Sequence, residues 1–407
     1  MEARAISKGQ RENPMNGRRF PKYLFTTLPT NDLGLLTRSL PIACELRTLG
    51  REVVFCSPAM APRQLVADAG FENLIPQHSI YDLIDMEQSI SGLSKFLVSR
   101  PWKKRKQNAF EFLRELVPAL PLKSAPKSRE VWNMDHAGAM MGMLNEGFVR
   151  ANCEAFRQLM KSCRADVIVD FWNPFAVIAA RASGKPVITV IQANAHPKSD
   201  GFIWWKPSPS DIPTPVNVVN RVLKDYGLGC IGSLADLSVG DLTLVLGTPE
   251  TDPLPDGVEV EHIGAVLWQN KGARLPTWID GMSRDRPLIW VYSGNPRYSS
   301  SGDLLDSEIV LSACTETLAT ESVQVVLTTG NHPSPESLLP LPTNFRHEPY
   351  LPGLLMAERA DLLIHHGGYG SCQTALYAGK PSVILPTYSE RLGNARRIEA
   401  LGRRRSC

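Results

Sequence analysis

The sequence has no apolar run that approaches the roughly 18 residues of a membrane-spanning helix. Residues 1–19 are polar and basic, and they lack the apolar core of a secretion signal. The sequence therefore predicts neither a transmembrane helix nor a secreted protein, and we expect residues 1–19 to be a disordered leader.

The sequence also has no metal-ligand pattern and no large net charge. The eight cysteines form no C-x-x-C pair, which predicts no metal site and fits a cytoplasmic protein with reduced thiols. The net charge of +3 is too small to indicate a nucleic-acid partner. With 43% hydrophobic and 21% charged residues, the 407-residue chain has the composition of a globular protein and the length of two domains.

A glycine-rich turn is the most informative feature that is present. Residues 365–371 read HHGGYGS; they follow an apolar run at 362–364 that predicts a buried strand and precede a predicted helix at 372–378. Such a turn presents backbone N–H groups at the positive end of a helix dipole, which favours a phosphate. The side chains of His366 and Ser371 would add hydrogen-bond donors.

The rest of the chain alternates short apolar strands with helices. Strands are expected at 23–27, 53–56, 166–170, 187–191, 242–246, 288–292, 323–328, 362–364 and 382–385. This alternation predicts doubly wound parallel sheets of the α/β class. The Pro-, Gly- and Asp-rich segment GTPETDPLPD opens a linker that we place at 247–283, between an N-terminal domain (20–246) and a C-terminal domain (284–407).

Longer motifs carry a family resemblance. HGG-x-G-S, then AL-x-x-G-x-P-x-V-x-x-P and N-A-x-R, resemble the donor-binding signature of the UDP-glycosyltransferase superfamily, and L-P-x-A-x-E-L near residue 40 resembles its N-terminal half. These are inverting enzymes with two Rossmann-like domains facing across a cleft (GT-B fold). The resemblance implies transfer of a hexose from a UDP- or dTDP-sugar to a hydroxyl of a small lipophilic acceptor, without a metal. Because family members continue well past the position of Gly402, we expect the C-terminus to be truncated.

The resemblance also assigns donor-binding positions. The glycine turn and a loop near residue 295 would hold the phosphates, and Tyr350 would stack on the nucleobase. The expected donor-binding residues are His366, Gly367, Gly368, Gly370, Ser371, Gly294, Asn295, Tyr350, Thr374, Glu390, Arg391 and Asn394.

Some of these positions depart from the family pattern. Thr374 stands where the family has a ribose-holding Glu, and Glu390–Arg391 stands where it has an acidic residue followed by Gln. A guanidinium only donates hydrogen bonds, so Arg391 accepts none from a sugar hydroxyl. The donor sugar and its nucleotide therefore stay open.

The general base is the largest departure. Leu35 stands where the family has the His that deprotonates the acceptor, and leucine takes no proton. Asp32 and Asp170 are the candidate catalytic residues, since partial burial raises a carboxyl pKa toward that of a base. The structural alternative for Asp32 is a helix N-cap. The alternative for the whole chain is a nucleotide-sugar-binding protein with little or no transferase activity; a sugar-nucleotide epimerase is a weaker one, because its signature is missing.

Residues 99–120 allow two interpretations. A basic run, SRPWKKRK, precedes a helix with an apolar face. A solvated loop followed by an ordinary amphipathic helix explains this pattern, and so does peripheral contact with an anionic membrane. Aromatic and Met-rich segments elsewhere in the N-terminal domain favour a lipophilic acceptor.

Overall fold

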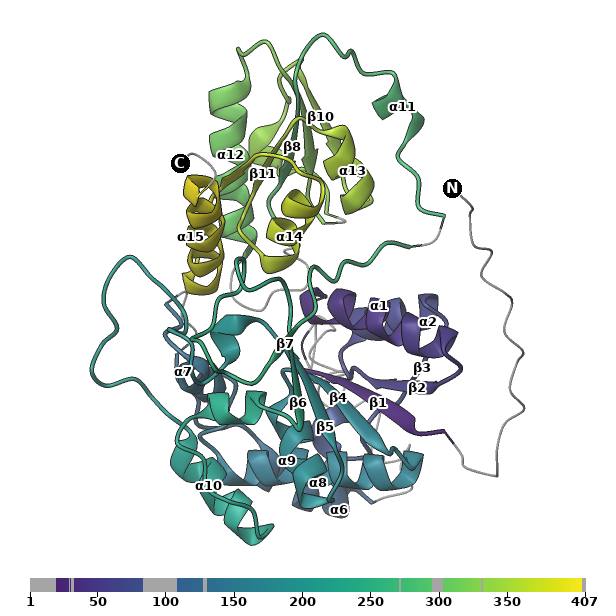
Figure 1. Cartoon of the computed structure of the whole chain (residues 1–407), viewed down its shortest axis with the longest axis vertical. Coiled ribbons are helices and arrows are strands. Elements are labelled where there is room, and N and C mark those ends of the chain that lie inside the picture. Colours follow the sequence, from purple (N-terminus) through teal and green to yellow (C-terminus); the bar gives the residue numbers. More distant parts are fainter. Residues whose placement is uncertain are drawn as a thin grey trace, which may run out of the picture.

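The structure is a computed structural model that describes residues 20–28, 30, 33–82, 108–126, 130–270, 272–294, 303–330 and 332–404. Two α/β domains lie one above the other in Figure 1, each built on its own parallel sheet. Within the part of the chain that is described, no helix has the length and apolar character needed to cross a membrane.

The first sheet has seven strands in the order β3-β2-β1-β4-β5-β6-β7, all parallel. Its strands are β1 (Lys22–Thr27), β2 (Glu52–Cys56), β3 (Glu72–Asn73), β4 (Val167–Phe171), β5 (Val187–Ile191), β6 (Leu242–Val245) and β7 (Glu261–His262). Its helices are α1 (Gly34–Thr48), α2 (Met60–Asp68), α6 (Ala109–Leu116), α7 (Met134–Met140), α8 (Glu146–Cys163), α9 (Pro174–Ala182) and α10 (Val216–Asp225).

Alternation along the strands gives this sheet two buried faces. Leu24 packs in one apolar cluster with residues of α8, α9 and α10, whereas its neighbour Phe25 packs in a second cluster with residues of α1 and α2. Ile168 and Val169 divide between the clusters in the same way. Near-continuous apolar strands are therefore needed, as expected for parallel strands covered on both faces.

The second sheet has five parallel strands in the order β10-β9-β8-β11-β12. Its strands are β8 (Leu288–Tyr292), β9 (Gln324–Thr328), β10 (Phe345–Glu348), β11 (Leu362–His365) and β12 (Ser382–Ile384). The helices that follow the first sheet in the chain are α11 (Thr277–Asp280), α12 (Asp303–Leu318), α13 (Gly353–Arg359), α14 (Tyr369–Tyr377) and α15 (Ser389–Arg404). Two further apolar clusters again cover its opposite faces, one with α13 and α14 and one with α12.

The strand positions agree with the sequence prediction to within one residue at most ends. The sequence prediction contained neither β3 nor β10, and three further details differ. β7 lies inside the segment predicted as a linker and pairs with β6, so β6 is not the last strand of the first sheet. α14 begins at Tyr369 rather than residue 372, and α15 begins at Ser389 rather than near residue 394.

α15 connects the two domains. In Figure 1 it runs from the upper domain toward α7 of the lower one. The backbone of Val131 and the hydroxyl of Ser389 exchange two hydrogen bonds, of 3.1 and 2.5 Å. Of the segment 99–120, residues 99–107 lie outside the described residues, and the predicted helix is α6, capped by Asn108 and Glu111 in a capping box.

Candidate functional site

The predicted phosphate turn lies at a switch point of the second sheet. β8 and β11 are neighbours in the sheet, and the chain continues from them in opposite directions, to β9 and to β12. In open α/β sheets ligands bind outside the carboxyl ends of such strands. The loops that leave these two ends begin with Ser293–Gly294 and with His366–Gly368.

Three glycines pack closely around this turn. Gly294 and Gly367 have φ angles of +109° and +84°, which L side chains rarely adopt. A Cβ at Gly367 would lie 2.9 Å from Ile384 and 3.0 Å from the carbonyl of Arg391. A Cβ at Gly368 would lie 2.5 Å from Nε2 of His366. Glycine is therefore favoured at these positions, because a side chain would be strained at Gly294 and Gly367 and crowded at Gly367 and Gly368.

His366 is the buried polar group at the centre of the turn. It is 8% exposed, and its ring meets that of Tyr292 edge-on with centroids 5.5 Å apart. Burial, and then the nearby Arg391 cation, hold the pKa of His366 well below its usual range, so the imidazole is neutral. Its Nδ1 has no hydrogen-bond partner among the described residues. A buried nitrogen left unpaired in this way is suited to a ligand that supplies the partner.

The helix that follows has an open N-terminus. Gly368 is the N-cap of α14, and no side chain caps it. The first bond of the helix runs from the Cys372 N–H to the Gly368 carbonyl at 3.1 Å. The N–H groups at the start of an uncapped helix, with Ser371 half-buried beside them, form a site that favours an anion.

Helix α15 holds the turn from the other side. The Asn394 amide donates to the Gly367 carbonyl at 3.0 Å and to Oε1 of Glu390 at 2.7 Å. Arg391 is 7% exposed; its guanidinium stacks over Tyr388 at 4.2 Å and donates to Thr387 at 2.6 Å. These α15 residues therefore lie beside the turn, where they make contacts within the protein.

The remaining predicted donor residues are more dispersed. Gly370 is exposed, and Thr374 is half-buried one turn further along α14. Tyr350 follows β10 and is 59% exposed, so its ring is free to stack on a planar ligand. Asn295 and the candidate base Asp32 lie outside the described residues.

Asp170 lies near the carboxyl end of β4. The switch point of the first sheet is between β4 and its neighbour β1. Asp170 is 2% exposed and accepts from the Thr26 hydroxyl at 2.5 Å and from the Asn173 N–H at 2.9 Å. Burial raises its pKa to about 7, although these hydrogen bonds oppose the rise. Asp170 also lines a small cavity with apolar walls that include Met134, Met141, Trp172, Ile191, Leu234 and Leu237.

Sequence reasoning missed Tyr369, which stands at the variable position of HGG-x-G. Its ring leaves the second domain and packs among residues of the first, and its hydroxyl donates to Asp252 at 2.8 Å. An aromatic residue inside a run of glycines was the available signal. Trp172 was also missed as a backbone feature: it directly follows β4, two residues after Asp170, and has a φ of +61°.

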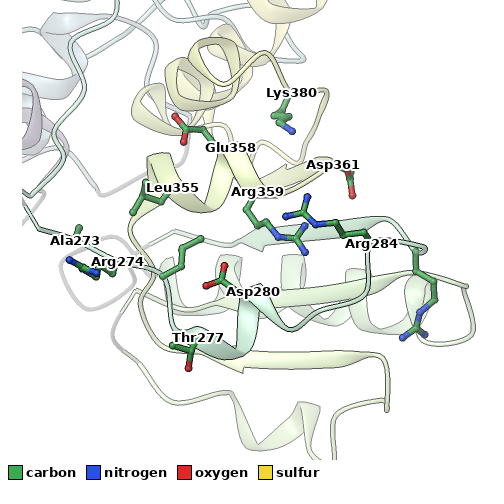
Figure 2. Close-up of a pocket in the computed structure, with 12 residues that line it drawn as sticks. Ala273, Arg274, Thr277, Asp280, Arg284, Leu355, Glu358, Arg359, Asp361 and Lys380 are labelled. Atoms are coloured by element: carbon green, nitrogen blue, oxygen red, sulfur yellow. The ribbon is translucent and has the colours of Figure 1, made fainter.

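A second cavity, of about 750 Å³, lies elsewhere in the second domain (Figure 2). Most of its walls are charged, and Arg284, Arg359, Asp361 and Lys380 line it. Asp361 and Lys380 precede β11 and β12, at the amino ends of the strands. The cavity is thus at the edge of the sheet opposite the glycine turn, where parallel sheets do not usually bind ligands.

Known proteins resemble this chain in sequence and in fold. Residues 313–404 match the family model of the erythromycin biosynthesis protein CIII-like C-terminal domain. A PGL/p-HBAD biosynthesis glycosyltransferase of Mycobacterium tuberculosis (strain ATCC 25177 / H37Ra) is 28% identical over 288 residues, 63% of this chain and 62% of the relative. A PGL/p-HBAD biosynthesis rhamnosyltransferase of Mycobacterium bovis (strain BCG / Pasteur 1173P2) is 27% identical over 276 residues, 62% of this chain and 59% of the relative. The chain thus spans about three fifths of these curated relatives.

Among solved structures, the glycosyltransferase VinC in complex with dTDP superposes with a TM-score of 0.58 at 16% identity, covering 93% of this chain and 84% of VinC. The likeness shows the fold, and it confirms the predicted α/β class with two Rossmann-like domains of the GT-B type. The matched C-terminal family model and the glycosyltransferase relatives agree with the resemblance to the UDP-glycosyltransferase superfamily that the sequence motifs indicate.

Proposed function

We propose that the chain is an inverting glycosyltransferase that moves a hexose from a UDP- or dTDP-sugar to a hydroxyl of a small lipophilic acceptor. The observation that supports it most is the buried, unpaired Nδ1 of His366 inside a glycine-rich turn, next to an uncapped helix N-terminus. The relatives are glycosyltransferases by name, and VinC was solved with dTDP, which supports a nucleotide diphosphate at this turn.

In the proposed reaction the acceptor oxygen attacks the anomeric carbon from the side opposite the nucleotide. The new C–O bond forms as the bond to the diphosphate breaks, the bonding electrons leave with the diphosphate, and the acceptor's proton passes to a base. The negative charge that develops on the diphosphate would be stabilised by the N–H groups that open α14, by neutral His366 as a hydrogen-bond donor and by Ser371.

Asp170 is the candidate base within the described residues. A carboxyl whose pKa is raised to about 7 is half-ionised near neutral pH, where it can both accept and return a proton. The cavity beside it has a volume of only about 10 Å³, room for about one water molecule, so the lipophilic acceptor rests on the aromatic and Met-rich segments of the first domain instead. Both of its oxygens already accept hydrogen bonds, so the competing role is to hold Thr26 and the turn at Asn173.

The second candidate function is nucleotide-sugar binding without efficient transfer. Leu35 at the position of the family His favours it. So do the contacts of Glu390 and Arg391 with Asn394 and Thr387, because they compete with sugar hydroxyls.

Two measurements test the proposal. Isothermal titration with UDP and with dTDP should detect binding, and His366→Ala should weaken it about tenfold, equivalent to about 1.4 kcal/mol. His78→Asn is the matched control, because His78 lies beside Glu115 in the first domain. Unchanged affinity in His366→Ala would exclude the turn at 365–371 as the site that binds the diphosphate.

The second measurement separates the two functions. The protein is incubated with UDP- and dTDP-hexoses and a panel of hydroxylated apolar acceptors, and released UDP or dTDP is assayed. Acceptor-dependent release identifies a transferase, and binding without release identifies the silent binder. If Asp32→Asn and Asp170→Asn both retain turnover, neither carboxylate is the base.

A further inference from the structure

Tyr369 extends from the phosphate turn into the other domain. It is the first residue of α14 and directly follows Gly368, yet its ring is 6% exposed within the apolar cluster of the first sheet, with Phe25, Leu36 and Leu246. Among the described residues of that cluster it is the only one that follows residue 268 in the chain. The guanidinium of Arg38, on α1, lies 5.1 Å from the ring centroid.

The Tyr369 hydroxyl ends on a fully buried carboxylate. It donates to Oδ2 of Asp252 at 2.8 Å, and Asp252 is 0% exposed. Burial raises the pKa of Tyr369, so the phenol keeps the proton that it donates. Gly247 has φ +86°, and a Cβ there would lie 2.9 Å from the hydroxyl, so the backbone is shaped to admit it.

Asp252 also joins parts of both domains. Its carboxylate accepts from the Ala193 N–H, just past β5, at 3.4 Å, and lies 3.7 Å from the guanidinium of Arg397 on α15. Arg397 in turn donates to Asn394 at 2.5 Å, and Asn394 holds the Gly367 carbonyl at 3.0 Å. Both ends of the glycine turn, Gly367 and Tyr369, are therefore connected to one buried carboxylate.

A second bridge runs parallel to the first. With its amide oriented to suit both neighbours, Gln192 accepts from Arg38 at 2.7 Å and donates to Glu390 at 3.2 Å. This bridge is also connected to the turn, because Glu390 accepts a hydrogen bond from Asn394, which donates to the Gly367 carbonyl. The polar contacts at this interface thus converge on the turn from both sides.

We infer that Tyr369 and Asp252 form an interdomain clasp that positions the phosphate turn, so that the geometry of the nucleotide site depends on contact between the two domains. Both are positioning residues. The inference rests on the proposed function for the identity of the ligand, but the clasp itself exists without it. Losing the hydroxyl removes one of two hydrogen bonds to Oδ2 of Asp252, which still accepts from the Thr251 hydroxyl at 3.1 Å, so the loss should loosen the turn without unfolding the chain.

The test compares Tyr369→Phe, which keeps the ring and its packing, with Tyr377→Phe as the matched control. Tyr377 ends the same helix and is 65% exposed. Hydrogen exchange of the full chain without ligand should be faster at the amides of 365–372 in Tyr369→Phe, by about tenfold. Affinity for dTDP or UDP by titration should fall about fivefold, with the thermal midpoint of the chain little changed. Tyr377→Phe should match the wild type in both.

Asp252→Asn is the conservative variant that keeps the hydrogen-bond acceptor. An asparagine oxygen still accepts from the Tyr369 hydroxyl, so its exchange at 365–372 should lie closer to the wild type than that of Tyr369→Phe. Unchanged exchange in Tyr369→Phe would overturn the clasp, and faster exchange with unchanged nucleotide affinity would overturn its effect on the site. If the wild type binds neither nucleotide, the proposed function fails, while the exchange measurement still decides the clasp.

Discussion

Gly368 and His366 pack so closely that a single methyl group would separate them: a Cβ on Gly368 would lie 2.5 Å from Nε2 of the imidazole. All three atoms that this Cβ would meet belong to the imidazole ring of His366, so the ring would have to move to make room. Gly294 faces the same ring from the neighbouring loop, with its hypothetical Cβ 3.5 Å from Nδ1. The imidazole thus occupies a space that exists because both neighbouring residues are glycines.

Gly368→Ala should therefore displace His366 and disturb the nucleotide site. We expect the affinity for UDP or dTDP to fall at least about tenfold and the free energy of unfolding to fall by about 1–3 kcal/mol, the usual cost of overpacking. Titration calorimetry and urea denaturation measure the two effects. Gly281→Ala is the control, since its Cβ would make only an ordinary contact of 3.6 Å and its φ is negative. Equal affinity in Gly368→Ala and Gly281→Ala would show that the imidazole does not contribute to binding.

Local patterns were sufficient to predict the turn and the strands except β3, β7 and β10, which have two to four residues each. Runs such as those of β8 and β11 are apolar because both faces of the sheet are covered, and glycines are needed where φ is positive or the backbone is crowded. The start of α14 was predicted three residues late because Gly368, rather than a side-chain cap, precedes the helix.

Contacts between distant residues were not predictable in this way. Tyr369 and Asp252 are 117 positions apart in the sequence, and no periodicity relates them. Glu390 and Arg391 were expected to face a sugar, and only the folded chain places them against Asn394 and Tyr388. The raised pKa of Asp170 likewise depends on burial by elements from several parts of the chain.

Asp170 should make the stability of the protein depend on pH. Its pKa is raised by burial to about 7, above that of an unfolded aspartate, so between about pH 4 and 7 the folded chain binds more protons than the unfolded chain. The free energy of unfolding should then fall as the pH rises through this range, by up to about 4 kcal/mol, and the loss should be complete above pH 7. Asp170→Asn has no proton to lose and should lack this fall.

Urea denaturation of the wild type and Asp170→Asn at pH 5 and pH 8 measures the difference. The stability of the variant relative to the wild type should improve by about 2–3 kcal/mol between the two pH values. Comparing the change between pH values cancels the constant effect of placing an amide beside the Asn173 N–H. Parallel pH dependence in the two proteins would mean that Asp170 is ionised throughout and would count against its role as a base near neutral pH.

Arg391→Gln should raise the pKa of His366. Burial is the main cause of the low value and would remain, but the Arg391 cation adds to it by repelling the proton, and the substitution removes that charge. An NMR titration of labelled histidine should place the His366 pKa higher in Arg391→Gln than in the wild type. The substitution also removes the stacking over Tyr388 and the bond to Thr387, so a loss of about 1 kcal/mol in stability is expected. Arg396→Gln, exposed on the same helix, should change neither quantity.

A His366 pKa that stays the same or falls would show that Arg391 does not act on the imidazole. A raised pKa with improved binding of a nucleotide sugar over the free nucleotide would instead show that the arginine limits sugar recognition, because glutamine supplies the acceptor that a guanidinium lacks.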